Sequence, residues 1–193
     1  MATQTVPGQE TTYKFTVAQF EQMISEGIFG EDDNVELVDG EVVIMSPINH
    51  PHAVVVSKLG LILSELVGRT AYVWAQQPLW LEERSRPQPD IALLKWREDF
   101  YTGKRPTGED TLLVIEVADT SLVADRGAKR TKYAKAAIPE YWIVNLRNKV
   151  VEVYSGLAGG KYGAERIAGR GESLQLPGGL RGSVYVDELL VEL

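Results

Sequence analysis

The sequence contains no cysteine and only two histidines among its 193 residues. The lack of cysteine excludes a disulfide framework, a thiolate metal site and a cysteine nucleophile. The histidines, His50 and His52, stand in H-x-H spacing, and no cysteine is present to complete the tetrahedral ligand set of a zinc ion. We therefore interpret the pair as part of a turn that leads into a helix.

Long apolar runs are also lacking, and none approaches the roughly 18 to 20 residues that a membrane helix needs. The N-terminal segment is polar and has neither the basic region nor the apolar core of a signal peptide. From these absences we expect a cytoplasmic protein with no membrane contact.

Positive charge is scarce, because the formal net charge is −7. The field of such a protein repels phosphates, which excludes a protein that coats nucleic acid through bulk charge but not a nuclease with local basic contacts. Residues 126–135, RGAKRTKYAK, carry five basic residues and no acidic one. This segment is either a solvated helix face or a surface that contacts phosphates.

The composition, with 44% hydrophobic and 24% charged residues, is typical of one globular domain. We predict a flexible tail over residues 1–12 and a single domain over 13–193. Apolar periodicity and turn signals predict helices over 16–29, 52–68 and 124–139, a hairpin over 34–47 around Asp39-Gly40, strands over 71–77, 79–83, 89–94, 111–117, 140–145 and 149–156, short strands in the glycine-rich C-terminal part, and a last turn near 186–190. Strands followed by helices and hairpins indicate a mixed α/β domain with a central sheet.

Two carboxylates stand in stretches that ought to be buried. Asp90 opens the strand PDIALL, and Glu116 lies toward the end of the most apolar strand, TLLVIEV. A buried carboxylate is costly unless a cation or hydrogen-bond donors meet it, and a divalent metal removes the repulsion between two of them. Paired acids at adjacent strand ends therefore suit Mg²⁺ or Mn²⁺ and phosphodiester chemistry. The alternative is that Asp90 caps a turn and Glu116 points to solvent.

A cation beside this metal would position the attacking water and stabilise the transition state. The predicted helix over 124–139 follows Glu116 directly. At about 100° per residue, its apolar face extends back to basic residues in the first turns, namely Lys129, Arg130 and Arg126. Lys132 falls on the other side, where we expect it to be solvated.

Taken together, the stretches VELVDGEVVIMSP, RPQPDIALL, LLVIEVADTS and DRGAKRTKYAKAAIPEYWIVN resemble, in order and spacing, the Uma-type restriction endonuclease family of the PD-(D/E)XK nuclease superfamily. The resemblance runs from about residue 16 to the C-terminus. Its most specific element is the set Asp125, Lys129 and Tyr133 at four-residue steps before IPEYWIV.

The resemblance implies a restriction-endonuclease-like fold, with a mixed sheet flanked by helices and with Asp90 and Glu116 as metal ligands. Superfamily members carry a lysine two residues after the second acid, but here that residue is Ala118, and the matching lysine is Lys129 on the next helix. Glu36 matches a recurrent acid of the family and is expected to bind the metal or a water.

The resemblance also implies a histidine near the site soon after MSP, and a homodimer. A second departure is Asn145, where relatives often carry Asp; we expect it to alter a turn and not the chemistry.

We therefore predict an Mg²⁺- or Mn²⁺-dependent endonuclease that acts on nucleic acid, with DNA as the expected substrate. Asp90, Glu116 and Lys129 would be catalytic, with Glu36 as a further metal ligand, and phosphate contacts are expected from Arg126, Arg130 and Lys132. Two alternatives stay open: a non-catalytic nucleic-acid-binding or regulatory protein that keeps the fold, and a metal-dependent phosphohydrolase on another substrate.

Overall fold

The computed structural model describes residues 12–30, 33–45 and 47–190 of the chain. The predicted tail, residues 1–12, thus lies outside the described residues except for its last member. In the described part, no helix combines the length and the apolar character that crossing a membrane requires.

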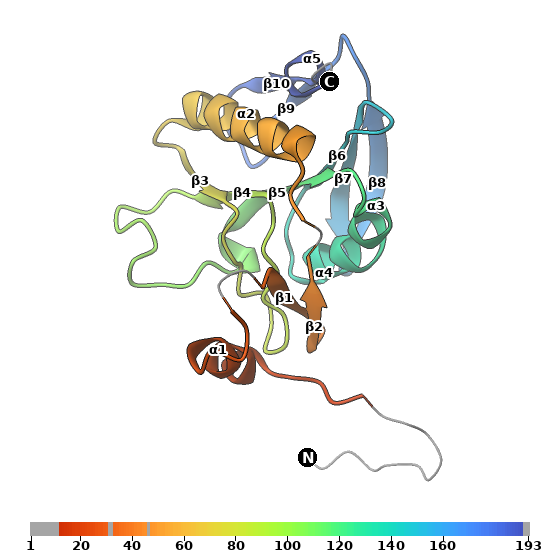
Figure 1. Ribbon diagram of the computed structural model, residues 1–193. Helices are drawn as coiled ribbons and strands as arrows, with labels where there is room; N and C mark the ends of the chain where they lie inside the picture. Colours follow the sequence, from red (N-terminus) through yellow and green to blue (C-terminus); the bar gives the residue numbers. More distant parts are fainter. Residues whose placement is uncertain (1–11, 31–32, 46, 191–193) are drawn as a thin grey trace.

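A mixed sheet of six strands forms the centre of the protein, in the order β3-β4-β5-β6-β7-β8 (Figure 1). β5 and β6 pair in parallel, and the other neighbours pair antiparallel. The strands are β3 Ala71–Ala75, β4 Ile91–Lys95, β5 Thr111–Ala118, β6 Tyr141–Asn145, β7 Val150–Ala158 and β8 Lys161–Ala168. This arrangement confirms the predicted mixed α/β class.

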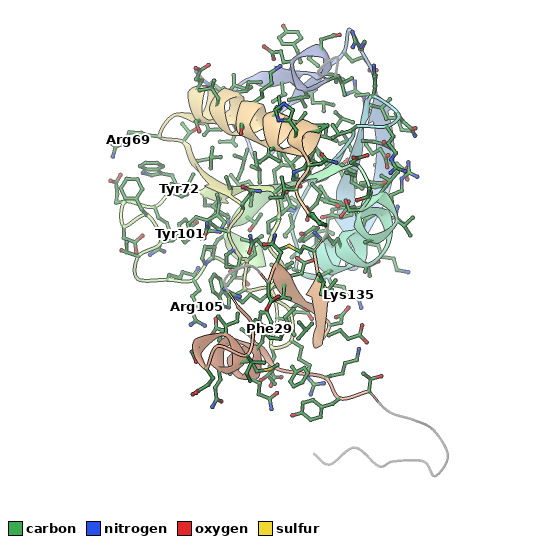
Figure 2. The ribbon with its side chains drawn as sticks, in the orientation of Figure 1. Phe29, Arg69, Tyr72, Tyr101, Arg105 and Lys135 are labelled. Atoms are coloured by element: carbon green, nitrogen blue, oxygen red, sulfur yellow. The ribbon has the colours of Figure 1, made fainter. Side chains whose placement is uncertain are left out.

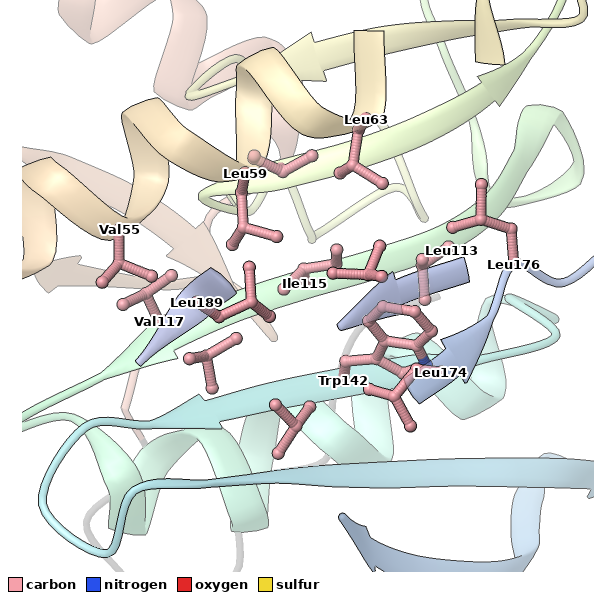
Figure 3. Close-up of a cluster of buried hydrophobic side chains, with 14 of the residues drawn as sticks. Val55, Leu59, Leu63, Leu113, Ile115, Val117, Trp142, Leu174, Leu176 and Leu189 are labelled. Atoms are coloured by element: carbon pink, nitrogen blue, oxygen red, sulfur yellow. The ribbon is translucent and has the colours of Figure 1, made fainter. Parts of the chain in front are cut away.

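One face of the sheet is covered by α2, His50–Val67, which ends at Gly68 with a positive φ of 48°. Because side chains alternate along a strand, Ile115 and Val117 of β5 point into this layer, where they pack with Leu59 and other apolar side chains (Figure 3). The short strands β9, Ser173–Gln175, and β10, Ser183–Tyr185, and the helix α5, Val186–Leu189, complete this layer.

The opposite face is covered by one helical segment made of α3, Leu122–Ala124, the π-helical turn η2, Asp125–Lys129, and α4, Arg130–Lys135. Tyr133 of α4 packs on Tyr141 of β6, with ring centroids 5.0 Å apart. Farther along the same layer, the ring centroids of Tyr72 and Tyr101 lie 6.4 Å apart (Figure 2). Val114, Glu116 and Ala118 of β5 face this layer.

A separate hairpin, β1 Val35–Val38 and β2 Glu41–Ile44, forms around Asp39 and Gly40, both with positive φ, as predicted. Leu37 packs against Phe20 of α1, Val17–Ser25, a helix that begins with a capping box from Thr16. The adjacent Glu36 therefore points to the opposite side of the hairpin, toward the large sheet.

Two strand predictions need correction. Residues 79–83 form no strand, because the chain folds back here: Leu81 N donates to Ser85 O, 3.1 Å, and only isolated bridges form. In the opposite sense, β8 is a strand of eight residues in the main sheet and not a short tail strand. Its exposed polar side chains leave little apolar alternation to reveal it.

A close backbone contact fixes how β5 enters the sheet. The 3₁₀ turn η1, Gly108–Asp110, leads into β5, and a Cβ built at Gly108 would lie 2.0 Å from the carbonyl oxygen of Ala136, at the end of α4. We expect Gly108→Ala to lower the free energy of unfolding by about 1–3 kcal/mol, because that backbone must shift. The measurement is urea denaturation followed by circular dichroism.

The matched control is Gly60→Ala within α2, where the added Cβ meets nothing within 4 Å. There we expect a gain of about 0.5–1 kcal/mol from higher helix propensity. Equal effects of the two substitutions would contradict the role given to the contact between Gly108 and Ala136.

Candidate active site

The sheet brings Asp90 and Glu116 side by side. β4 and β5 are antiparallel with Ile91 opposite Ile115, so the next position places Asp90 opposite Glu116. Both side chains emerge on the face that α4 covers, because they share the alternation of Ala92 and Val114. The adjacency predicted for two strand-end acids is therefore present.

Asp90 ends its strand by replacing a ladder hydrogen bond with one from its side chain. Its Oδ2 accepts a hydrogen bond from the backbone N–H of Val117 at 2.8 Å. In a regular antiparallel ladder, a backbone carbonyl of β4 would accept that N–H. The same Oδ2 lies 3.0 Å from Nε2 of His52, in the first turn of α2. This contact raises the pKa of His52. As the resemblance implied, one of the two histidines faces the site.

Glu116 meets a lysine and a tyrosine at one oxygen. Lys129 Nζ lies 3.0 Å from Glu116 Oε1, and the hydroxyl of Tyr133 donates to the same oxygen at 2.6 Å. The lysine amine is thus within hydrogen-bond distance of the acid, as the inward helix face predicted. The contact of the tyrosine hydroxyl was not predicted, because a buried Tyr and a buried Phe give the same periodicity.

Lys129 also joins two further acids. Its Nζ lies 3.6 Å from Glu36 Oε1 and 3.9 Å from Asp125 Oδ1. Glu36 is held in place by the backbone N–H of Gln88, at 3.0 Å from Oε2, and Asp125 by the hydroxyl of Ser121, at 2.6 Å. Asp125 comes from the π-helical turn, a feature common at functional sites. Sequence reasoning noted Asp125 for its spacing but gave it no role.

One lysine cannot neutralise three buried carboxylates. Burial raises the pKa of Glu116 from its ordinary 4.5 to about 8, with Asp90, Asp125 and Glu36 adding to the rise and Lys129 opposing it. Burial likewise raises the pKa of Asp125. For Lys129, burial alone lowers the pKa, but Glu116, Glu36 and Asp125 outweigh it and the net change is upward. The site therefore holds its lysine charged and carries an excess of acid.

Lys132 corrects a prediction. It is 3% exposed and not solvated, because its ammonium pairs with Asp39 in the hairpin turn and lies 3.0 Å from Glu82. An ammonium held in this way is not free to meet a phosphate, so Lys132 leaves the set of candidate nucleic-acid contacts. Its physical role is to attach the hairpin to the helix.

The two arginines of the basic segment also have acidic partners. Arg126 forms a two-pronged pair with the buried Glu152, at 2.8 and 2.7 Å. Arg130 lies 5.0 Å above the ring of Tyr154 and 3.8 Å from Glu165. Both side chains keep partial exposure, so they remain candidate phosphate contacts, although their charge is largely neutralised.

Asn145 lies at the end of β6. Its Oδ1 accepts the N–H of Asn148 at 3.1 Å, and its Nδ2 donates to Glu152 at 2.9 Å. The residue therefore shapes the turn between β6 and β7, as predicted.

A cavity of about 470 Å³ is lined by acids that lie far apart in the sequence. Its walls include Asp90, Glu116, Glu36, Asp125, Lys129 and His52. Sequence reasoning missed Asp119, which also lines the cavity and is bound by Asn49 at 2.6 Å and Arg147 at 3.1 Å. No motif distinguishes this aspartate from an ordinary loop residue.

The carboxylates of the cavity supply oxygen donors of the kind that a hard metal ion prefers. Among the described residues, no three or more His, Asp or Glu side chains are arranged to hold one. Two carboxylates, with water and substrate oxygens, are a usual set for Mg²⁺. The hydrogen bonds at Glu116 use Oε1 and those at Asp90 use Oδ2. The second oxygen of each carboxylate is therefore the one suited to a hard cation.

Comparison with known proteins identifies the family of the chain and a solved structure of similar fold. The family model described as "Uma2: Putative restriction endonuclease" matches residues 17–188. The fold is similar to a crystal structure from Anabaena variabilis ATCC 29413 whose description reads "putative nuclease belonging to DUF820". That similarity has a TM-score of 0.66 and 14% identity, and it covers 91% of this chain and 97% of the other. No curated protein matches the chain.

The pKa of Glu116 predicts how stability depends on pH in metal-free solution with chelator. Between its unfolded value of 4.5 and its folded value of about 8, the folded protein keeps a proton that the unfolded chain has lost. Stability is therefore lost as pH rises through this window, by about 1.4 kcal/mol for each unit of the difference. Urea denaturation at pH 5, 6, 7 and 8 measures the slope.

The control is Glu116→Gln, which keeps the shape and removes the titration. Its free energy of unfolding should change less over the same window than that of the unaltered protein. Equal slopes would contradict the raised pKa of Glu116.

Proposed function

Because the chain belongs to the Uma2 family, whose description is that of restriction endonucleases, we propose that its cavity hydrolyses phosphodiester bonds of nucleic acid, with DNA as the expected substrate. The observation that carries this proposal is the 3.0 Å contact between Lys129 and Glu116 in the cavity that also holds Asp90. Two acids and one ammonium on neighbouring elements are the parts that metal-assisted hydrolysis requires.

Asp90 and Glu116 would hold Mg²⁺ or Mn²⁺, with Glu36 as a further ligand or as the acceptor for a water beside them. A bound divalent ion supplies Lewis-acid stabilisation of the phosphate and lowers the pKa of a coordinated water. The excess acid supports this assignment, because Glu36, Glu116 and Asp125 share one lysine. Metal binding would relieve this repulsion.

In the hydrolysis, the oxygen of a water forms a bond to phosphorus as the bond from phosphorus to one ester oxygen breaks. One proton of the water ends on the departing alkoxide, so the products are a phosphomonoester and an alcohol. Lys129 would orient the water and stabilise the negative charge that develops on the phosphate oxygens. Oε1 of Glu116 accepts hydrogen bonds from both the ammonium of Lys129 and the hydroxyl of Tyr133, and so keeps the ammonium in position.

A second candidate is a nucleic-acid-binding or regulatory protein without turnover, which Ala118 favours because the superfamily lysine is missing there. Binding of nucleic acid without metal-dependent cleavage would favour it. The third, a phosphohydrolase on another substrate, would cleave small phosphodiesters and leave DNA and RNA intact. The homodimer expected from the resemblance also stays a prediction.

The metal-ligand assignment is tested with Asp90→Asn and Glu116→Gln, which keep the size of each side chain. We expect each to reduce Mg²⁺- or Mn²⁺-dependent cleavage of a plasmid by at least about a hundredfold, since each removes charge from the site. Circular dichroism should show an unchanged fold.

A matched pair on the hairpin provides the control. Glu36→Gln alters the buried acid near Lys129, whereas Glu41→Gln alters an exposed acid that pairs with Lys14. Activity should fall in the first and persist in the second. Retained metal-dependent cleavage in both Asp90→Asn and Glu116→Gln would end this mechanism.

The role of Lys129 is tested by Lys129→Met, with Lys135→Met as the control on the exposed side of the same helical segment. We expect kcat to fall by about a hundredfold or more in the first, because a charge-stabilising group is lost. The second should keep kcat within about twofold, as expected for a surface substitution. Equal kcat in the two variants would remove Lys129 from the catalytic set.

A further inference from the structure

The cavity is unusual for a duplex-binding site in its charge. All 20 lysines and arginines of the chain lie in the described ranges 12–30, 33–45 and 47–190, and Lys129 alone among them lines the cavity. Five acids line it, namely Glu36, Asp90, Glu116, Asp119 and Asp125. Arg147 reaches the cavity only through Asp119, which neutralises it.

Three strongly exposed side chains at the cavity are aliphatic. Ile44 at the end of β2 is 82% exposed, Ile48 before α2 is 51% exposed, and Val123 of α3 is 88% exposed. All three line the cavity. We call them the aliphatic rim. They come from three separate segments, so their convergence is a property of the fold and not of one apolar run.

These features do not suit the backbone of an intact duplex. Most contacts that hold a duplex go to its phosphates, and lysine and arginine supply the attractive charge. In the basic segment, Lys132 is buried, and Arg126 and Arg130 each pair with an acid that lies outside the cavity lining. A duplex laid over the cavity would place phosphates against the aliphatic rim and near five carboxylates.

An unpaired nucleotide meets the same surface favourably. Its base, which a duplex hides by stacking, presents an apolar face that can be buried against aliphatic side chains. The cavity volume of about 470 Å³ lies in the range for small-molecule sites. A single nucleotide could therefore enter with its phosphate toward Glu116 and Asp90, where metal would neutralise it.

We propose that the substrate class of this site is nucleic acid that is unpaired at the scissile phosphate, either single-stranded or locally opened, and that the aliphatic rim holds the unpaired base. This inference rests on the proposed nuclease function. It adds the specificity-determining residues Ile44, Ile48 and Val123, none of which belongs to the acid–lysine set.

The experiment compares three labelled DNA substrates: a single strand, the duplex formed with its complement, and that duplex with an internal unpaired loop. Cleavage by the full-length chain is measured with Mn²⁺, and binding by fluorescence anisotropy with Ca²⁺. We expect the single strand and the loop to be cleaved, and the single strand to be bound, at least about tenfold better than the duplex, on the scale of one base contact.

The rim is tested by the double variant Ile44→Ser/Val123→Ser. We expect both KM and Kd for the single strand to rise about tenfold in this variant. The kcat should change little, because the rim holds the base and not the reacting atoms. The matched control is Ile167→Ser in β8, which is 59% exposed and lies outside the cavity. It should leave the preference intact.

Cleavage of the duplex as fast as the single strand would overturn the inference while leaving the nuclease function in place. Absence of cleavage of all three substrates would end the nuclease function, and the binding measurement would then decide the inference. Affinity for the single strand that is equal to or weaker than affinity for the duplex overturns the inference. Affinity for the single strand that is tenfold tighter, and that the double variant loses, supports it. A double variant that changes the oligomeric mass by light scattering, but not the preference, would assign the rim to a protein interface and overturn the inference.

Discussion

The arrangement of the site depends on a single buried ammonium. Lys129 connects acids from three elements: Glu36 in the hairpin, Glu116 in the central strand and Asp125 in the π-helical turn. Buried carboxylates at such proximity repel one another, and removing the one cation among them would leave that repulsion uncompensated. The cluster is therefore held together by one cation, whose single charge is too small to offset the repulsion among all of its acids. A site of this kind favours any ligand that brings positive charge.

The sheet supplies the second constraint. β4 could continue past Ile91, but Asp90 uses its side chain to take the N–H of Val117 and so stops the ladder beside Glu116. One carboxylate oxygen thus performs the task of a backbone carbonyl in a residue that lines the cavity. The position of this acid is as rigid as the strand on which it depends, which is the kind of support that a site on a loop lacks.

Much of this could be predicted from the sequence because the signals were local. Asp39-Gly40 has the backbone preferences of a two-residue turn, Gly68 those of a helix end, and the apolar strand around Glu116 could only be buried. Helical periodicity turned Lys129 inward. The errors arose where long-range contacts decide: Lys132 lies where periodicity expects solvent, but the hairpin turn covers it and supplies Asp39. Asp119 and the aliphatic rim converge only through tertiary structure, and no spacing in the sequence records that.

Two of these contacts have a mechanical meaning when they are considered as a pair. Glu36 meets Lys129, and Asp39, three residues later, meets Lys132, three residues after Lys129. A single attachment would act as a pivot about which the hairpin could swing, but two attachments spaced along both elements act as a clamp. To withdraw its acid from the cavity, the hairpin would have to release both lysines at once. Glu36 is thus kept in place before any substrate arrives.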